Sequence, residues 1–290
     1  MITLDYFNGQ PQFVFSLNGG HGIYLDNWAI IDLAKGPRSR RDTFLEALRR
    51  VGSVLFSFAN AAEIGGPRGA SEAAVTDFLK AIGRYWVPFQ MNAFRVEERE
   101  AAGRVDAPIA TELFLRLAAR RYIETASKPG AAALDASDLF DLSAVIPLAQ
   151  AWHDDGAEAA ELTRRLREGI ELLATSAATP AEAADLKLPA HGADPGRRVG
   201  FVIHHLFRTL VKQAKSHRFK AGDGFDFCHA VMATAYASVA TLDETWKKRV
   251  GLLPAEAQAP QVFYAPELDA FVDAVVALTP RAVITWRVTG

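Results

Sequence analysis

Two aspartates each follow a short apolar segment of the chain. Asp26 ends the segment 22–26, and Asp243 comes directly after the β-branched run 238–242. Both segments have the length and composition of buried strands. A strand that leaves the core places the next residue at the carboxyl edge of its sheet, where open α/β sheets bind ligands. We therefore expect both carboxylates to line such an edge.

Two further acids adjoin predicted helices. Asp226 follows the Gly-Asp-Gly turn at 222–224, and the small and apolar residues after it predict that a helix begins here. Glu63 lies in a helix that is predicted to follow the apolar strand 54–57. Asp223, in the turn itself, is either an additional ligand or a turn residue.

Carboxylates gathered at one edge need a counter-charge, because two unit charges about 5 Å apart repel by roughly 3 kcal/mol at an effective dielectric constant of about 20. A divalent cation removes this repulsion, and an all-oxygen ligand set favours Mg²⁺ or Mn²⁺ over Zn²⁺, which prefers His or Cys. Pairs of such ions cleave phosphodiesters by activating water and stabilising the leaving oxygen. The four acids therefore indicate metal-dependent phosphodiester hydrolysis.

In their order and local spacing, the four acids resemble the motifs of the PIN-domain nucleases. That family has an aspartate ending its first strand, a helical glutamate after the second, an aspartate opening a late helix, and a Ser/Thr-x-Asp ending a later strand. The matching residues here are Asp26, Glu63, Asp226, and Thr241 with Asp243. The resemblance implies an α/β fold, a three-layer domain with a mostly parallel central sheet. It also implies endoribonuclease activity on RNA with Mg²⁺ or Mn²⁺.

The family pattern also divides the chain. The interval between Glu63 and Asp226 is much longer than in compact PIN domains, so we expect residues 1–100 and 197–290 to form a discontinuous PIN-like domain around a helical insertion at 101–196. Two apolar series recur in this insertion at helical spacing, at Ile109, Leu113 and Leu117 and at Leu162, Leu166, Ile170 and Leu173. The insertion is a candidate surface for a protein partner or for self-association.

Two other functions compete with the nuclease hypothesis. All four acids have simpler roles, because aspartates cap helices and a glutamate can be a solvated helix residue. The family carries a hydroxyl residue after its first aspartate, whereas this chain has Asn27 followed by Trp28. This departure supports a catalytically weak or inactive PIN-like module that binds protein. A second alternative is a 5′-nuclease-like enzyme acting on DNA.

A run of positive charge precedes the Gly-Asp-Gly turn. No acid occurs between positions 195 and 222, and the cations of this stretch are Arg197, Arg198, Arg208, Lys212, Lys215, Arg218 and Lys220. In the helix predicted at 200–216, Arg208, Lys212 and Lys215 share a polar stripe with His204, opposite an apolar face. We expect the three cations of this stripe to contact phosphates. The alternative is a solvated helix face.

Other ionisable residues have competing interpretations. His229 shares a helix face with Asp226 and is either a substrate phosphate contact or a core histidine. The acids Glu97, Glu98 and Glu100 are expected on a charged surface.

Composition limits the class of protein. Half of the 290 residues are hydrophobic and the net charge is −2, so the chain can bury a large core and is not a generally basic nucleic-acid binder. The single cysteine, Cys228, excludes an internal disulfide and a thiolate zinc cluster, and we expect it to be packed.

We find no leading signal and no apolar run of about 18 residues, so we expect a cytoplasmic protein without membrane contact. Strands are predicted at 12–17 and 281–289, which either pair or extend a sheet edge, and a helix at 266–278.

Overall fold

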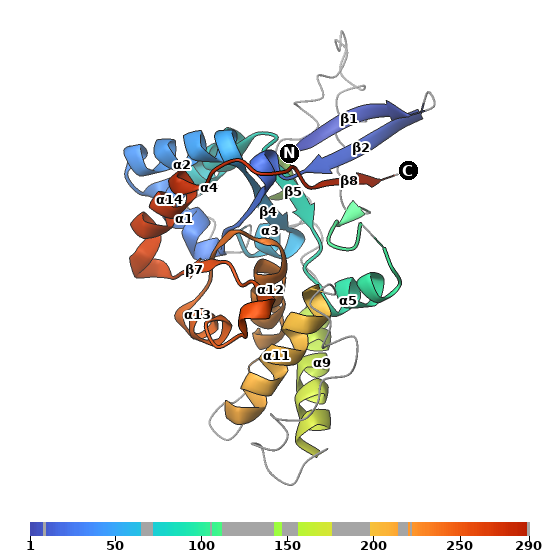
Figure 1. Ribbon diagram of the computed structural model, residues 1–290. Helices are drawn as coiled ribbons and strands as arrows, with labels where there is room; N and C mark the ends of the chain where they lie inside the picture. The colour runs from blue at the N-terminus through green and yellow to red at the C-terminus, as the bar shows by residue number, and fades with distance from the viewer. Residues whose placement is uncertain are drawn as a thin grey trace. The chain divides into compact units, whose positions relative to one another are not determined.

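The computed structural model describes residues 1–7, 10–64, 72–104, 106–111, 142–146, 156–175, 198–213, 220 and 222–288. The chain forms two compact units, each with its own core. The first unit comprises residues 1–90, 108–153 and 265–290, and the second comprises residues 91–107 and 154–264. Figure 1 follows the elements in chain order.

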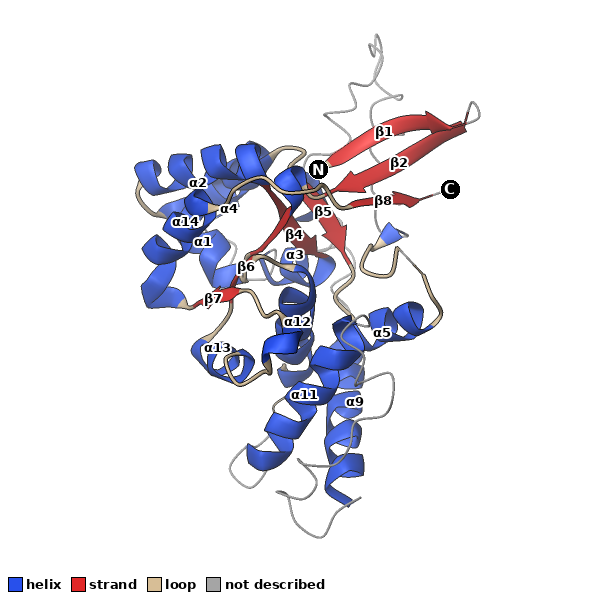
Figure 2. Cartoon of the chain, in the orientation of Figure 1, coloured by secondary structure: helices blue, strands red, loops and turns tan. Residues whose placement is uncertain are grey.

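A five-stranded parallel sheet confirms the predicted α/β class. Its strands are β5 (Trp86–Phe89), β4 (Gly52–Ser57), β3 (His21–Tyr24), β6 (Val239–Thr241) and β7 (Gln261–Phe263), in that order across the sheet. All residues of β3, β4, β5 and β6 are buried, as expected for a parallel sheet with helices on its flanks (Figure 2). This double burial explains why the strands read as apolar runs and not as alternating patterns.

A smaller antiparallel sheet belongs to the first unit. Its order is β1 (Ile2–Phe7), β2 (Gln10–Ser16) and β8 (Thr285–Val288). In the register of β2 and β8, Phe15 lies opposite Trp286. The predicted terminal strands therefore exist and pair with each other, whereas β1 was not predicted.

The helices of the first unit surround an aromatic core. They are α1 (Asn27–Lys35), α2 (Arg38–Val51), α3 (Phe58–Ile64), α4 (Glu72–Ile82) and α14 (Leu268–Ala277), with the short 3₁₀ turns η1 (Asn18–Gly20), η2 (Leu142–Ala144) and η4 (Ala265–Glu267). The Phe44 ring of α2 lies 6.0 Å from both Phe78 of α4 and Phe271 of α14, measured between ring centroids. Phe271 is fully buried, and α14 confirms the helix predicted at 266–278.

The second unit contains a helical cluster. Its helices are α5 (Ala93–Ala101), α9 (Gly156–Thr175), α11 (Arg198–Gln213), α12 (Asp223–Tyr236) and α13 (Glu244–Val250), with the 3₁₀ turn η3 (Ala255–Ala257). Phe227 of α12 stacks on Phe207 of α11 at 5.2 Å and on Phe94 of α5 at 5.8 Å between ring centroids. Gly224 allows α12 to approach α9 closely, because a Cβ there would lie 2.3 Å from the backbone nitrogen of Thr163.

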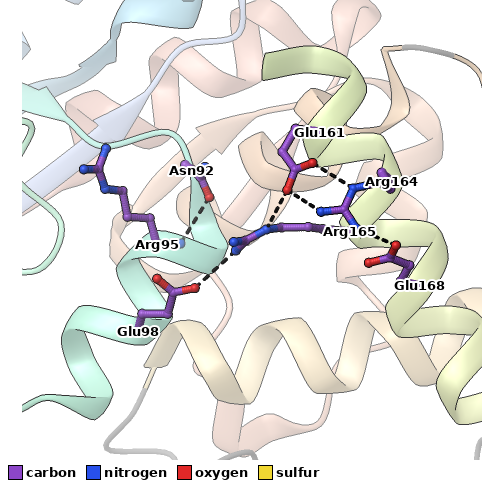
Figure 3. Close-up of polar contacts among 7 residues, drawn as sticks. All are labelled: Asn92, Arg95, Glu98, Glu161, Arg164, Arg165 and Glu168. Atoms are coloured by element: carbon purple, nitrogen blue, oxygen red, sulfur yellow. Dashed lines mark hydrogen bonds and ion pairs between the residues drawn. The ribbon is translucent and has the colours of Figure 1, made fainter. Parts of the chain in front are cut away.

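Ion pairs connect α5 to α9 across the surface of the second unit (Figure 3). Arg165 of α9 reaches Glu98 of α5 at 3.2 Å and Glu161 of its own helix at 3.2 Å. Arg164 pairs with Glu161 at 2.6 Å and with Glu168 at 2.5 Å. All five side chains are partly exposed, so water and salt screen the pairs, and we expect each to contribute little to stability.

Several predicted elements need correction or fall outside the described ranges. Helix α12 begins at Asp223 and not at Asp226, because Gly222 is its N-cap and Asp223 already lies in the first turn. Ile109 is not helical, since its backbone forms an isolated antiparallel bridge with Phe89. Leu113, Leu117 and most of the predicted insertion lie outside the described residues. The predicted helix over Leu162, Leu166 and Ile170 is confirmed as α9, with all three side chains buried.

Among the residues that the structure describes, no helix is both long and apolar enough to span a bilayer.

Candidate carboxylate site

Asp26 lies at the carboxyl end of β3, where the strand order of the parallel sheet reverses. From β3, the strands β4 and β5 follow on one side and β6 and β7 on the other. Doubly wound sheets bind ligands beyond the carboxyl ends of their strands at this reversal. The topology therefore places Asp26 at the position where a ligand of this fold class is expected.

The Asp26 side chain also begins helix α1. One carboxylate oxygen, Oδ1, accepts a hydrogen bond from the backbone nitrogen of Asn27 at 2.8 Å, and the Asp26 carbonyl accepts one from Ala29 at 3.0 Å. Asp26 has extended backbone angles, as an N-cap requires. The simpler role considered for this acid, helix capping, is thus confirmed. It does not compete with ligand binding, because a carboxylate has two oxygens and several acceptor directions.

A buried polar network supports the segment that carries Asp26. Asn60 of α3 is fully buried, and its Oδ1 accepts hydrogen bonds from the Ser57 backbone nitrogen at 3.1 Å and from Ser57 Oγ at 2.7 Å. Its Nδ2 donates to Asn27 Oδ1 at 3.3 Å and lies 3.5 Å from Tyr24 Oη. The network ties the carboxyl ends of β3 and β4 to the first turn of α1. It therefore restricts how far the Asp26 carboxylate can move.

This network was not predicted from the sequence. Its only local signal is the Ser57-x-x-Asn60 spacing at a strand-to-helix junction, where short polar side chains bond to nearby backbone groups. Within the described part of the chain, Asn27 Nδ2 and Trp28 Nε1 are buried without a hydrogen-bond partner. Buried donors without acceptors cost free energy. These two residues also mark the departure from the PIN-domain pattern.

Glu63 lies in the helix that leaves the same edge of the sheet as Asp26. Strands β3 and β4 are adjacent and parallel, with Tyr24 opposite Leu55, so the segments that follow them leave the sheet on the same side. Glu63 lies near the end of α3, directly after β4, and its side chain is exposed. Asp26 and the start of the helix that carries Glu63 therefore lie at one strand edge of the first unit, and the approach of the two carboxylates stays a prediction.

The second unit carries the other two acids. Asp243 is the N-cap of α13, and its Oδ1 accepts a hydrogen bond from the Trp246 backbone nitrogen at 2.7 Å. Asp226 is exposed in the first turn of α12, and Asp223 accepts a hydrogen bond from the Lys220 backbone nitrogen at 2.7 Å. All three carboxylates thus lie at helix starts, where the helix dipole favours negative charge.

A buried cation that the sequence analysis did not single out neighbours these acids. The Arg249 side chain is 5% exposed, donates from Nε to Gln213 Oε1 at 3.1 Å, and lies 4.6 Å from the centre of the Trp246 ring. Burial lowers the pKa of Arg249, while the charges of Asp243 and Asp223 oppose that shift. Arg249 therefore supplies positive charge near Asp243 and Asp223.

The donor chemistry of the predicted set fits a hard divalent cation, because every predicted ligand is a carboxylate. Within the described ranges, no group of three or more His, Cys, Asp or Glu side chains is arranged as a metal-ligand set. Asp26 and Glu63 belong to one unit, and Asp226 and Asp243 to the other. The joint four-carboxylate site stays a prediction.

The predicted phosphate contacts on α11 are only partly described. Arg208 is half-buried and Lys212 is exposed, while Lys215 lies outside the described residues. The apolar face predicted for this helix is confirmed, since Ile203 and Leu210 are buried. His229 is buried in α12, and this burial lowers its pKa to about 4. Its surroundings favour a core histidine over a phosphate contact.

Cys228 is a free, buried thiol, which confirms the predicted packing of this side chain.

We compared the chain with protein-family models, with curated proteins and with solved structures, and none of the three comparisons gave a match.

Proposed function

We propose that the protein is a Mg²⁺- or Mn²⁺-dependent nuclease that cleaves RNA internally, with the three-layer arrangement of a PIN-like domain. One observation carries the proposal: Asp26 follows β3 at the reversal of a doubly wound sheet, and Glu63 follows the adjacent parallel strand β4. This is the edge at which such sheets bind ligands. In phosphate chemistry Mg²⁺ is usually held by one or two protein carboxylates together with the substrate phosphates, so the two acids of these segments are sufficient in number.

In this proposal each acid has a defined task. Asp26, Glu63, Asp226 and Asp243 hold the metal, with Asp223 as an additional ligand. The metal, when bound, activates water and stabilises the leaving oxygen. The chain supports this chemistry by orienting Asp26, whose Oδ1 is held by the Asn27 backbone amide above the Asn60 network. RNA as substrate follows from the family resemblance.

The cationic face of α11 provides the phosphate contacts in the same proposal. Arg208 and Lys212 lie one helical turn apart, with Lys215 completing the stripe in sequence. Charge contacts of this kind bind nucleic acid without reading its sequence, and they weaken as salt rises. His229 has a packing role in this scheme, because its ring is buried.

A second candidate function is a PIN-like protein-interaction module. It is favoured by the capping hydrogen bonds of Asp26 and Asp243, which give both acids a structural role without metal. The charge of Arg249 provides a further reason for acids in the second unit. In this case the residues of the predicted insertion are the surface to test for a protein partner or for self-association.

The two candidates differ in their response to metal and to substrate. We would incubate labelled single-stranded RNA, structured RNA and flap DNA with the protein in Mn²⁺, Mg²⁺ or a chelator, and record thermal stability under the same conditions. The nuclease proposal predicts RNA cleavage and Mn²⁺ stabilisation, both reduced in Asp226→Asn. Glu244→Gln is a matched control, because Glu244 is also an exposed first-turn acid. Preference for flap DNA would indicate a 5′-nuclease instead. Absence of both cleavage and metal stabilisation would favour the interaction module.

A further inference from the structure

Three helix ends of the second unit meet at the side chain of Glu100. Glu100 lies in the last turn of α5, and its Oε1 accepts a hydrogen bond from the Tyr236 hydroxyl, at the end of α12, at 2.5 Å. Its Oε2 accepts a hydrogen bond from the backbone nitrogen of Val199, in the first turn of α11, at 3.1 Å. The Gly200 backbone amide also bonds to the Glu100 side chain. The expectation that Glu100 lies on a charged surface is therefore wrong, since this side chain is half-buried and both of its carboxylate oxygens accept hydrogen bonds.

The start of α11 explains why an acid is tolerated at this position. A carboxylate near the carboxyl end of its own helix faces the negative end of that helix dipole. The first-turn amides of α11 have no partners within their helix and carry the positive end of its dipole. Glu100 satisfies two of these amides from a different helix. Hydrogen bonds to an ionised acceptor are roughly twice as strong as those between neutral groups.

The charges around Glu100 act in opposing directions. Burial raises the pKa of the Glu100 carboxyl, and the hydrogen bonds from Tyr236 and Val199 and the charge of Arg198 oppose this shift. On α5 itself, the neighbouring Arg99 pairs with Asp106 at 2.8 Å. The net result is a pKa above the ordinary value, so this carboxyl takes up a proton at a higher pH than an exposed glutamate.

Two other ionisable contacts lie on the same helices and must be separated from Glu100. His204 of α11 lies 3.8 Å from Glu97 of α5. Glu98 of α5 points toward Arg165 of α9 in the surface ion pairs of Figure 3.

We propose that Glu100 is a proton-sensitive anchor for the start of α11, which holds this helix end when it is ionised and loosens it when it takes up a proton. Helix α11 carries Arg208 and Lys212, so protonation of Glu100 would also loosen one end of the helix that bears this cationic face. The inference does not depend on the nuclease proposal, because it concerns only contacts within the second unit.

Proton binding by Glu100 is linked to the stability of the fold. The folded-state pKa of Glu100 is raised, so the folded protein binds this proton more tightly than the unfolded chain does. The contribution of Glu100 to global stability is therefore largest at low pH and falls as pH rises through the raised pKa. When only the start of α11 opens, Glu100 stays half-buried beside Tyr236 but loses the Val199 and Gly200 amides that lower its pKa, so protonation favours this opened state. Acidification should therefore loosen the start of α11 locally, without a global loss of stability from this group. A contact without a titrating carboxyl would change neither the local protection of the α11 start nor the global stability with pH.

Amide hydrogen exchange of the full-length protein tests the proposal. Protection of the Val199 and Gly200 amides, corrected for intrinsic exchange, should fall about tenfold between pH values of about 8 and about 4.5, given the stronger charge-assisted bonds. In Glu100→Gln the protection should be low and independent of pH. In Tyr236→Phe the transition should move to higher pH, because the phenol no longer stabilises the ionised carboxyl.

Two control variants assign the transition. Glu98→Gln and His204→Gln should each leave the Val199 transition in place. Wild-type protection that does not change with pH, or a transition that survives in Glu100→Gln, would overturn the proposal. So would a transition that disappears in His204→Gln or that fails to move in Tyr236→Phe, and this last outcome is informative even where Glu100→Gln folds poorly.

Discussion

Replacing Asn60 by alanine tests the buried network beneath Asp26. The substitution leaves the Ser57 backbone amide, the Ser57 hydroxyl and Asn27 Oδ1 without the partner they have in the wild type. Asn60 is fully buried, so water does not replace the lost contacts directly. Each stranded buried group costs about 1–3 kcal/mol, partly relieved by relaxation. We therefore expect Asn60→Ala to lower the free energy of unfolding by about 3 kcal/mol.

Urea unfolding measures this loss as a lower midpoint at an unchanged m-value. Amide exchange in β4 and in the first turn of α1 would localise the damage, and the second unit should keep its wild-type protection. Asn92→Ala is the matched control, because Asn92 Oδ1 caps α5 by accepting a hydrogen bond from the Arg95 backbone nitrogen at 3.1 Å, and such a cap is worth about 1 kcal/mol. An Asn60→Ala loss no larger than that of Asn92→Ala would refute the network.

Three further predictions concern packing, titration and capping. Gly224→Ala should destabilise the second unit by about 2 kcal/mol or more, because the added Cβ would meet the Thr163 backbone. The control Gly222→Ala adds its Cβ in open space and should be nearly neutral. Thermal unfolding of the two variants compares their stabilities. His229 has its pKa lowered to about 4 by burial, so the stability that it contributes is complete above its ordinary pKa of about 6.5 and is lost as pH falls toward 4. The loss is about 3 kcal/mol, and His229→Gln should flatten this part of the pH–stability curve measured by urea titration. Asp26→Ala should cost about 1 kcal/mol in the same assay and Asp26→Asn only a few tenths, because asparagine also caps helices.

Parts of the fold are visible in the sequence because they depend on local patterns. The apolar runs of β3 and β4 and the capped helix α13 have strong local signals. Strand β5 was missed, because Pro88 interrupts its pattern and proline is tolerated in a sheet mainly at an edge, which is where β5 lies. Strand β7 has only three residues and no comparable signal.

The positions of the candidate acids were predictable only where they follow directly from the order of strands and helices along the chain. The aspartates after β3 and β6 are recognisable because a strand end precedes each of them. Arg249 and Glu100 were not recognisable, since both lie in charged runs that are typical of solvated surfaces. Their burial depends on contacts with Gln213 and Tyr236, which are distant in sequence. Asn60 was not recognisable as the centre of a network, because its contacts with Tyr24 and Asn27 join residues that are distant in sequence.

The central claim is that the strand-edge carboxylates carry phosphodiester cleavage, and Asp26 tests it most directly. We would measure single-turnover cleavage of labelled RNA in Mn²⁺ by wild type, Asp26→Asn and Asp32→Asn. Asparagine keeps the helix cap at position 26 but loses the charge, and Asp32 is an exposed acid on the same helix. We predict metal-dependent cleavage that falls by about 100-fold or more in Asp26→Asn, equivalent to about 3 kcal/mol, and is unchanged in Asp32→Asn. Cleavage by folded Asp26→Asn at the wild-type rate, or no cleavage by the wild type in any metal, would contradict the account.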